Sequence, residues 1–105
     1  EIGYRSAADA AIKPWEWPNS SEQRPSVFAT TAGLETQANC YQAFFEVVWS
    51  QAWLAGVYWW KWFPEIYSSR PGDGFTPQDK PAEQILKRWY QAPLNAQQGV
   101  KETPA

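Results

Sequence analysis

The chain has 105 residues, which is enough for one small domain but short for an enzyme with an enclosed cleft. Nine basic and eleven acidic residues are scattered singly and give a formal net charge of −2, so the chain lacks the basic surface expected for binding nucleic acid or an anionic membrane. It contains no His and a single Cys, Cys40, which excludes His-based triads, His-ligated metals and a disulfide within the chain.

The first part of the chain is predicted to be a strand end followed by a long loop. Residues 1–4 are typical of the end of a strand, and residues 5–31 show little hydrophobic periodicity apart from a helical turn expected at residues 6–12. Trp15 and Trp17 lie between prolines on this loop, so we expect the two indoles to pack on a surface. The alternative is that they cap the core beneath the loop.

The next stretch is predicted to be an amphipathic helix of about 18 residues that begins around Gly33. Its apolar face recurs at the helical spacing, at Leu34, Ala38, Tyr41, Phe45, Val48 and Ala52. Cys40 falls within this pattern and is expected to be a small buried hydrophobe. A link of only a few residues then leads to the following strand.

Residues 56–63 are predicted to be a buried strand, because they combine three Trp, one Tyr and one Phe with flanking Gly56 and Pro64. Successive side chains of a strand point to opposite faces, so Tyr58, Trp60 and Trp62 share one side, and Val57, Trp59 and Lys61 share the other. Both sides are bulky, as in a parallel sheet of an α/β protein, and Lys61 is expected to reach water at the strand's end. So many aromatic faces with polar edges also suit a sugar.

A second long loop and a second helix follow. Residues 71–74 are a strong turn signal within a loop that extends to about residue 79. Pro81 then suits the first turn of a helix that runs to about Tyr90, with Ile85, Leu86 and Trp89 on its inner face. Residues 91–105 are polar and are expected to be a frayed tail.

Each predicted long loop follows a strand, and the short link follows a helix. With parallel strands and right-handed crossovers, both long loops gather on one face, which is where α/β barrels carry their active sites. Seven residues are expected to meet there: Glu1, Trp15, Trp17, Trp60, Trp62, Tyr67 and Phe75. Glu1 is the best catalytic candidate, because a retaining glycosidase needs a carboxylate nucleophile beside an aromatic sugar-binding surface.

Short motifs stand in a characteristic order along the chain: Glu1-Ile2-Gly3-Tyr4; Pro14-Trp15; Gln37-Ala38 with Tyr41-Gln42-Ala43; Gly56-Val57-Tyr58-Trp59-Trp60-Lys61-Trp62; and Lys80-Pro81-Ala82-Glu83 with Trp89-Tyr90. Their order and spacing resemble the C-terminal part of glycoside hydrolase family 113, which consists of retaining (β/α)8-barrel enzymes, chiefly endo-β-1,4-mannanases. The resemblance implies an α/β fold, a C-terminal fragment of a TIM barrel that comprises the end of strand 7, helix 7, strand 8 and helix 8. Residues 1–90 would be this portion of the barrel, and residues 91–105 the tail.

The resemblance also implies roles for individual residues. Glu1 corresponds to the nucleophile, and Trp60 to the Trp that floors the sugar site, with Trp62 as the next choice and Trp59 as a less favoured one. Tyr4 and Trp15 are further substrate-binding candidates. The implied partners are an oligo- or polysaccharide and the remaining barrel segments of the parent chain, with no nucleic acid or membrane. No metal or organic cofactor is implied.

The family's acid/base Glu has no counterpart in this sequence, so the chain alone is expected to be inactive. The loop acids Glu16, Glu65 and Asp73 lack the aromatic setting of Glu1. Arg5 and Lys61 are either cations that keep Glu1 ionised or solvated side chains at strand ends. Two other functions stay open, a glycosidase of the same clan acting on β-glucan or xylan, and a non-catalytic carbohydrate-binding module that uses the Trp residues.

Overall fold

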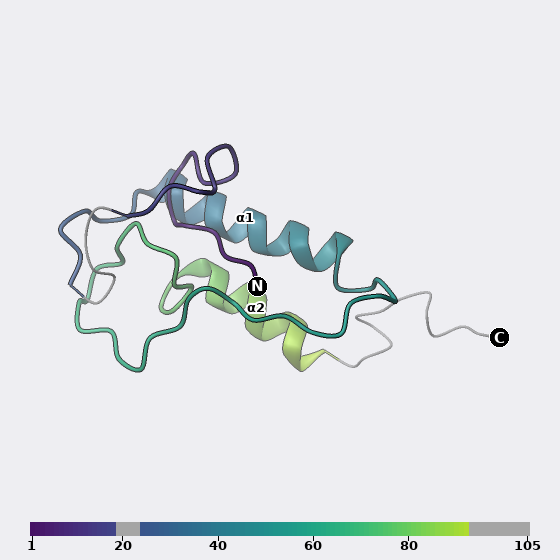
Figure 1. Cartoon of the computed structure of the whole chain (residues 1–105). Coiled ribbons are helices and arrows are strands. Elements are labelled where there is room, and N and C mark those ends of the chain that lie inside the picture. The colour runs from purple at the N-terminus through teal and green to yellow at the C-terminus, as the bar shows by residue number, and fades with distance from the viewer. Residues whose placement is uncertain (19–23, 93–105) are drawn as a thin grey trace.

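Two helices form the framework of the described part of the chain, which comprises residues 1–18 and 24–92 of a computed structural model. Helix α1 spans Thr31–Val47 and helix α2 spans Pro81–Gln91. They pack against each other, and the N-terminal segment runs along them beside the segment that links them (Figure 1). Neither helix is long and apolar enough to cross a membrane. The tail expected at residues 91–105 lies almost wholly outside the described residues.

Helix α1 confirms the predicted helix, with shifted ends. Thr30 precedes it, and the Thr30 Oγ1 atom accepts a hydrogen bond of 2.9 Å from the Gly33 N–H, as expected of an N-cap. The helix ends at Val47, earlier than predicted, where residues 47–50 combine β-branched, aromatic and Ser side chains of lower helix propensity. Ala52, which was expected on the apolar face, is therefore outside the helix and exposed.

Helix α2 also confirms its prediction. It begins at Pro81, whose missing N–H costs nothing in the first turn. Glu83 supports this end of the helix by accepting a hydrogen bond of 2.6 Å from the Asp79 N–H. The predicted inner-face residues Ile85, Leu86 and Trp89 are half-buried, and Ala82 is completely buried.

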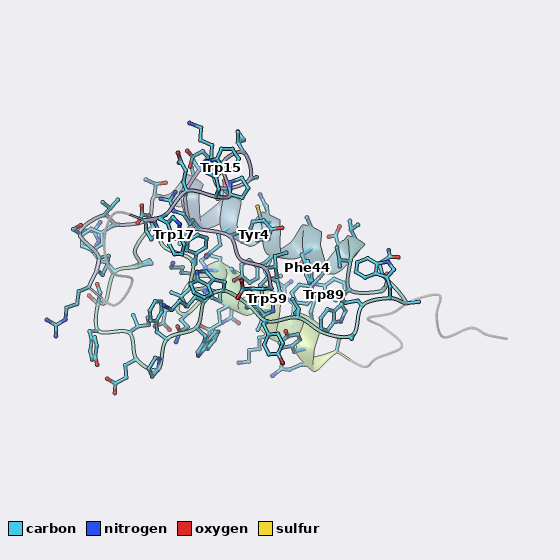
Figure 2. The ribbon with its side chains drawn as sticks, viewed as in Figure 1. Tyr4, Trp15, Trp17, Phe44, Trp59 and Trp89 are labelled. Atoms are coloured by element: carbon cyan, nitrogen blue, oxygen red, sulfur yellow. The ribbon has the colours of Figure 1, made fainter. Side chains whose placement is uncertain are left out.

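Stacked rings form the core between the helices. The Tyr41 and Trp59 rings stack with centroids 4.4 Å apart and planes at 12°, and Phe45 stacks on Trp89 at 5.2 Å and 8°. Phe44 meets the Trp59 ring edge-on at 5.1 Å. Figure 2 shows Phe44, Trp59 and Trp89 together on one part of the molecule. Much of the aromatic content of the sequence is therefore used in packing.

The predicted strand at residues 56–63 is wrong as an element of this structure, which has no strand among the described residues. One isolated parallel bridge pairs Ile2 with Trp59, through hydrogen bonds from the Ile2 N–H to the Tyr58 carbonyl (3.1 Å) and from the Trp60 N–H to the Ile2 carbonyl (2.7 Å). A strand is stabilised by neighbours on its sides, and within residues 1–18 and 24–92 the only bridge of this segment is with Ile2. The segment is not covered on both faces either, since Tyr58 is 83% exposed and Trp62 is 51% exposed.

The first long loop begins with tight turns. The Ala10 N–H donates to the Ala7 carbonyl (3.0 Å) and the Ile12 N–H to the Asp9 carbonyl (2.9 Å), in the region where a helical turn was expected. The loop then meets the second long loop, through an isolated antiparallel bridge between Phe28 and Gly72. The two long loops therefore lie together, as the sequence predicted.

Candidate functional site

A pocket of about 420 Å³ lies where the N-terminal segment meets the two long loops. Its volume is within the range of about 300–1,000 Å³ that is usual for ligand pockets. Four stretches of the described chain contribute to its lining: Glu1, Ile2 and Gly3; Pro14, Trp15 and Trp17; Trp60; and Phe75. The lining therefore combines a carboxylate with several aromatic rings.

The Trp17 ring contacts two other aromatic rings of the pocket edge-to-face. The Trp17 ring lies 6.2 Å from the Trp60 ring at an interplanar angle of 87°, and 5.6 Å from the Phe75 ring at 71°. Trp60 and Phe75 are half-buried, whereas Trp17 is 68% exposed. In Figure 2, Trp15 and Trp17 lie apart from the cluster of Phe44, Trp59 and Trp89. These loop indoles are thus not part of the core between the helices.

Backbone contacts hold the segment that carries Glu1 against Trp60. The Trp60 N–H donates to the Ile2 carbonyl, and Gly3 lies so close that a Cβ atom there would collide with the Trp60 carbonyl oxygen. Only Gly permits this approach at position 3. The close packing places the exposed Glu1 and the half-buried Trp60 in the lining of one pocket.

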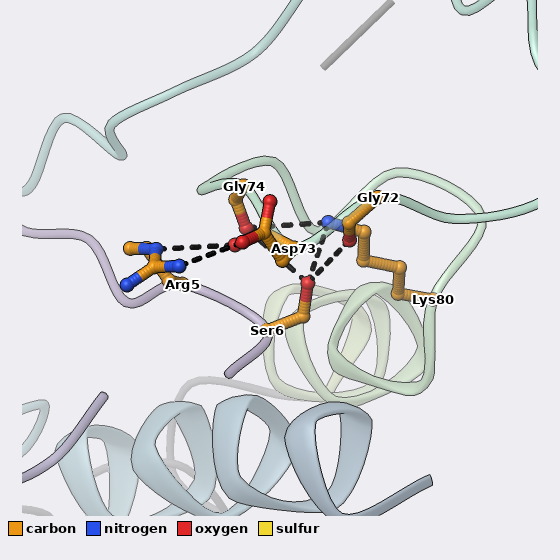
Figure 3. Close-up of polar contacts among 6 residues, drawn as sticks. All are labelled: Arg5, Ser6, Gly72, Asp73, Gly74 and Lys80. Carbon is orange, nitrogen blue, oxygen red and sulfur yellow. Dashed lines mark hydrogen bonds and ion pairs between the residues drawn. The ribbon is translucent and has the colours of Figure 1, made fainter. Parts of the chain in front are cut away.

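A buried polar cluster fixes the loop that precedes Phe75 (Figure 3). The Arg5 Nη2 atom pairs with Asp73 Oδ2 at 2.8 Å, and the Ser6 Oγ atom donates to the Gly72 carbonyl at 2.7 Å. The Lys80 Nζ atom donates to Ser6 Oγ at 3.0 Å and to the Gly74 carbonyl at 3.3 Å. Charged groups are rarely buried unless they are paired in this way, so the cluster joins the N-terminal segment firmly to the second loop.

The two cations that the sequence associated with Glu1 have other partners. Arg5 is buried and forms its ion pair with Asp73, so the interpretation of Arg5 as a solvated side chain is wrong. Lys61 is exposed, as predicted, and its Nζ atom lies 5.0 Å from the centroid of the Trp60 ring and 4.9 Å from that of Phe63. This is a cation–π arrangement beside the pocket.

Gln37 of α1 connects the pocket segments to the helix. Its Nε2 atom lies within hydrogen-bond distance of the carbonyl groups of Tyr4 (2.9 Å), Phe75 (3.3 Å) and Thr76 (3.1 Å). The side chain is fully buried. The sequence showed Gln37 only as part of a motif, because nothing local reveals carbonyl partners more than thirty positions away.

The structure brings together some of the predicted site residues and not others. Glu1, Trp15 and Trp60 line the pocket. Three others lie outside the lining: Tyr4, Trp59 and Trp62. Tyr4 packs edge-on against the Tyr41 ring at 6.2 Å, and burial, followed by the nearby Cys40, raises its pKa.

Trp59 and Trp62 differ in what surrounds them. Trp59 belongs to the core, where its Nε1 atom donates a hydrogen bond of 2.9 Å to the Tyr90 hydroxyl. Trp62 is largely exposed. Tyr67, which was expected to meet the loops at this face, lines a different pocket with Arg24 and Ser68.

Trp17 and Phe75 line the pocket but were not among the candidate substrate-binding residues. The available signal was their position on the two long loops, which were expected to gather at one face. Among residues 1–18 and 24–92, no group of three or more His, Cys, Asp and Glu side chains is placed to hold a metal ion.

Comparison with known protein families identifies the chain. The model of the family described as Glycoside Hydrolase Family 113 matches residues 1–80. The chain belongs to this family. The matched range includes every described residue that lines the pocket, from Glu1 to Phe75. No curated protein and no solved structure matches the chain.

Membership of glycoside hydrolase family 113 identifies a glycoside hydrolase sequence of a mannanase family, so the substrate is a carbohydrate. The family fold is a (β/α)8 barrel. The described residues contain two helices and no strand. One parallel bridge joins the segment that precedes α1 to the segment that precedes α2. A barrel is therefore not seen in this structure. The pocket described above is the candidate site of this glycoside hydrolase.

Proposed function

We propose that Glu1 is the nucleophile of a retaining glycoside hydrolase that cleaves β-1,4-mannan, and that Trp60 forms the floor of the sugar site. One observation carries this proposal: Glu1 and Trp60, which are far apart in the sequence, line the same pocket. An indole face suits the apolar face of a hexose, and a carboxylate beside it suits the positive charge that develops at the anomeric carbon.

The reaction would proceed by double displacement. A Glu1 carboxylate oxygen attacks the anomeric carbon while the bond to the leaving oxygen breaks, and a carboxylic acid gives that oxygen its proton. Water then attacks the anomeric carbon of the glycosyl-enzyme ester. The same group, which is now a carboxylate, takes the proton from this water. Glu1 is released and the sugar keeps its anomeric configuration.

A second carboxyl group is required about 5–5.5 Å from the nucleophile. Among the described residues that line the pocket, Glu1 is the single acidic one. We therefore propose that the acid/base residue is supplied by other segments of a (β/α)8 barrel, of which these residues form the last two units. The parallel alignment of residues 2 and 59, each on a segment followed by a helix, supports this assignment. The 105 residues alone should be inactive.

The decisive experiment replaces the proposed nucleophile in the complete protein. Glu1→Gln should lower kcat on manno-oligosaccharides by roughly 10³-fold or more, because the covalent intermediate can no longer form. The exposed Glu35→Gln on α1 is the matched control and should retain activity. A 2-deoxy-2-fluoro-mannosyl fluoride should also add one sugar mass to the peptide that contains Glu1. Unchanged turnover by Glu1→Gln would refute the proposal.

A panel of β-mannan, β-glucan and xylan separates the proposed substrate from its alternatives in the same clan. The exposure of Trp15 and Trp17 favours one further function, that of a carbohydrate-binding module. In that case the 105-residue chain would fold alone and oligosaccharides would quench its Trp fluorescence, with no hydrolysis by the complete protein.

A further inference from the structure

Trp17 presents a large apolar ring to solvent while its orientation is fixed by neighbours. It is 68% exposed, and it is held edge-on by both Trp60 and Phe75. Edge-to-face pairs are worth about 0.5–1.5 kcal/mol each beyond area burial, so these contacts restrain the indole. A restrained indole with an exposed surface is preorganised for a ligand, so it loses little conformational entropy on binding.

The angle between the two indoles decides what this ligand can be. The planes of Trp17 and Trp60 meet at 87°, so the apolar face of one pyranose ring cannot stack on both indoles. A hexose that lies on Trp60 leaves the face of Trp17 free for a second ring. The pocket, at about 420 Å³, has the size of sites that take ligands larger than one hexose.

The loop that places Phe75 behind Trp17 is itself fixed. Phe75 follows the turn held by Arg5 and Asp73, and the Gln37 amide is within hydrogen-bond distance of the Phe75 carbonyl. Phe75, which contacts Trp17 edge-on, is therefore fixed to the N-terminal segment and to α1. This support distinguishes Trp17 from Trp53, which is 71% exposed and is not part of the pocket lining.

We propose that Trp17, supported by Phe75, is a second sugar-binding surface that takes the hexose next to the one on Trp60. It rests on the proposed function, because it needs a β-linked oligosaccharide in this pocket. Trp17 then determines specificity for chain length, since it contributes only when the substrate has a ring beyond the one on Trp60. If Trp17 only packed over the loops, its substitution would weaken the binding of all ligands equally.

The test measures binding against ligand length in the complete protein. In a Glu1→Gln background, which prevents turnover, calorimetry gives Kd for mannose, mannobiose and mannohexaose. Trp17→Ala should weaken the binding of mannobiose and mannohexaose by about 10-fold, the upper end of what one aromatic contact contributes, and leave mannose, the shortest ligand, unchanged. Trp53→Ala is the matched control and should change the Kd of none of them. Thermal unfolding is followed in parallel.

If Trp17→Ala does not fold, Trp17→Phe provides the test instead. The smaller ring should lose about threefold in mannohexaose affinity, again without an effect on the shortest ligand. An equal loss at every ligand length, or no loss at all, overturns the role of Trp17. Turnover by the Glu1 variant is measured separately, so a failure of this inference is distinguishable from a failure of the proposed nucleophile.

Discussion

Gly3 and Trp60 approach so closely that a methyl group at position 3 would collide with the Trp60 carbonyl oxygen. This contact sits beside the parallel pairing of Ile2 with Trp59 and two residues after Glu1. The distance between the proposed nucleophile and the proposed sugar floor therefore depends on a residue with no side chain.

Gly3→Ala should separate these two segments. Because the colliding atom is backbone, the chain must shift, and we expect a loss of about 1–3 kcal/mol in the free energy of unfolding together with a fall in kcat of the complete protein. Gly56→Ala is the control, since a Cβ atom there would meet nothing within 4 Å. Urea unfolding and steady-state kinetics provide the measurements, and equal behaviour of the two variants would contradict the role given to Gly3.

Trp59 and Trp60 are adjacent but should respond differently to substitution. Trp59 stacks on Tyr41 in the core, so Trp59→Ala should cost about 3–5 kcal/mol in the free energy of unfolding. Trp60 lines the pocket, so Trp60→Ala should lower kcat/KM on manno-oligosaccharides with a smaller change in stability. Thermal unfolding and kinetics of both variants check this. The reverse pattern would make Trp59 the sugar floor.

The sequence predicted the two helices because their signals are local. The apolar spacing around Tyr41 and the proline at position 81 need no distant partner to be recognised. The alternation of residues 56–62 also placed Trp59 and Trp60 on opposite sides, and in the structure one packs in the core while the other lines the pocket. The strand itself depends on neighbouring strands, and the part of the chain that the structure describes supplies this segment with one bridge, to Ile2.

Local sequence patterns do not predict contacts between residues that are far apart in the sequence. Arg5 and Asp73 are 68 positions apart, and neither lies in a charge pattern that points to the other. The long loops were expected to meet, but the edge-on order of Trp17, Trp60 and Phe75 follows from turns and hydrogen bonds that no spacing encodes.

The Arg5–Asp73 pair predicts a large effect of single substitutions. Both side chains are nearly buried, so Asp73→Ala leaves a buried guanidinium without its partner and should cost about 3–5 kcal/mol. The double variant Arg5→Leu/Asp73→Leu should be less destabilised than the sum of its single variants, because the guanidinium and the carboxylate that pair with each other are removed together. Urea unfolding of a double-mutant cycle measures this coupling, with Glu35→Gln as the exposed control. Additive losses would show that the pair is not coupled.

Tyr41 predicts how stability changes at alkaline pH. Burial, and to a lesser extent Tyr90 and Tyr4, raises the pKa of Tyr41 above its ordinary value of about 10. The unfolded chain loses this proton near pH 10 while the folded chain keeps it, so the unfolded state binds fewer protons and stability falls as pH rises above about 10. Below that pH the contribution is complete and constant.

Tyr41→Phe should remove this part of the alkaline loss. It also removes a buried hydroxyl that has no hydrogen-bond partner among the described residues, so stability near neutral pH should rise by about 1 kcal/mol. The measurement is urea unfolding at about pH 8 and about pH 11, on either side of the ordinary Tyr pKa. The exposed Tyr58→Phe is the control. Tyr4, whose pKa is also raised, should leave a smaller residual slope in the Tyr41 variant. A slope equal to that of the Tyr58 variant would show that Tyr41 ionises as readily in the folded chain as in the unfolded one.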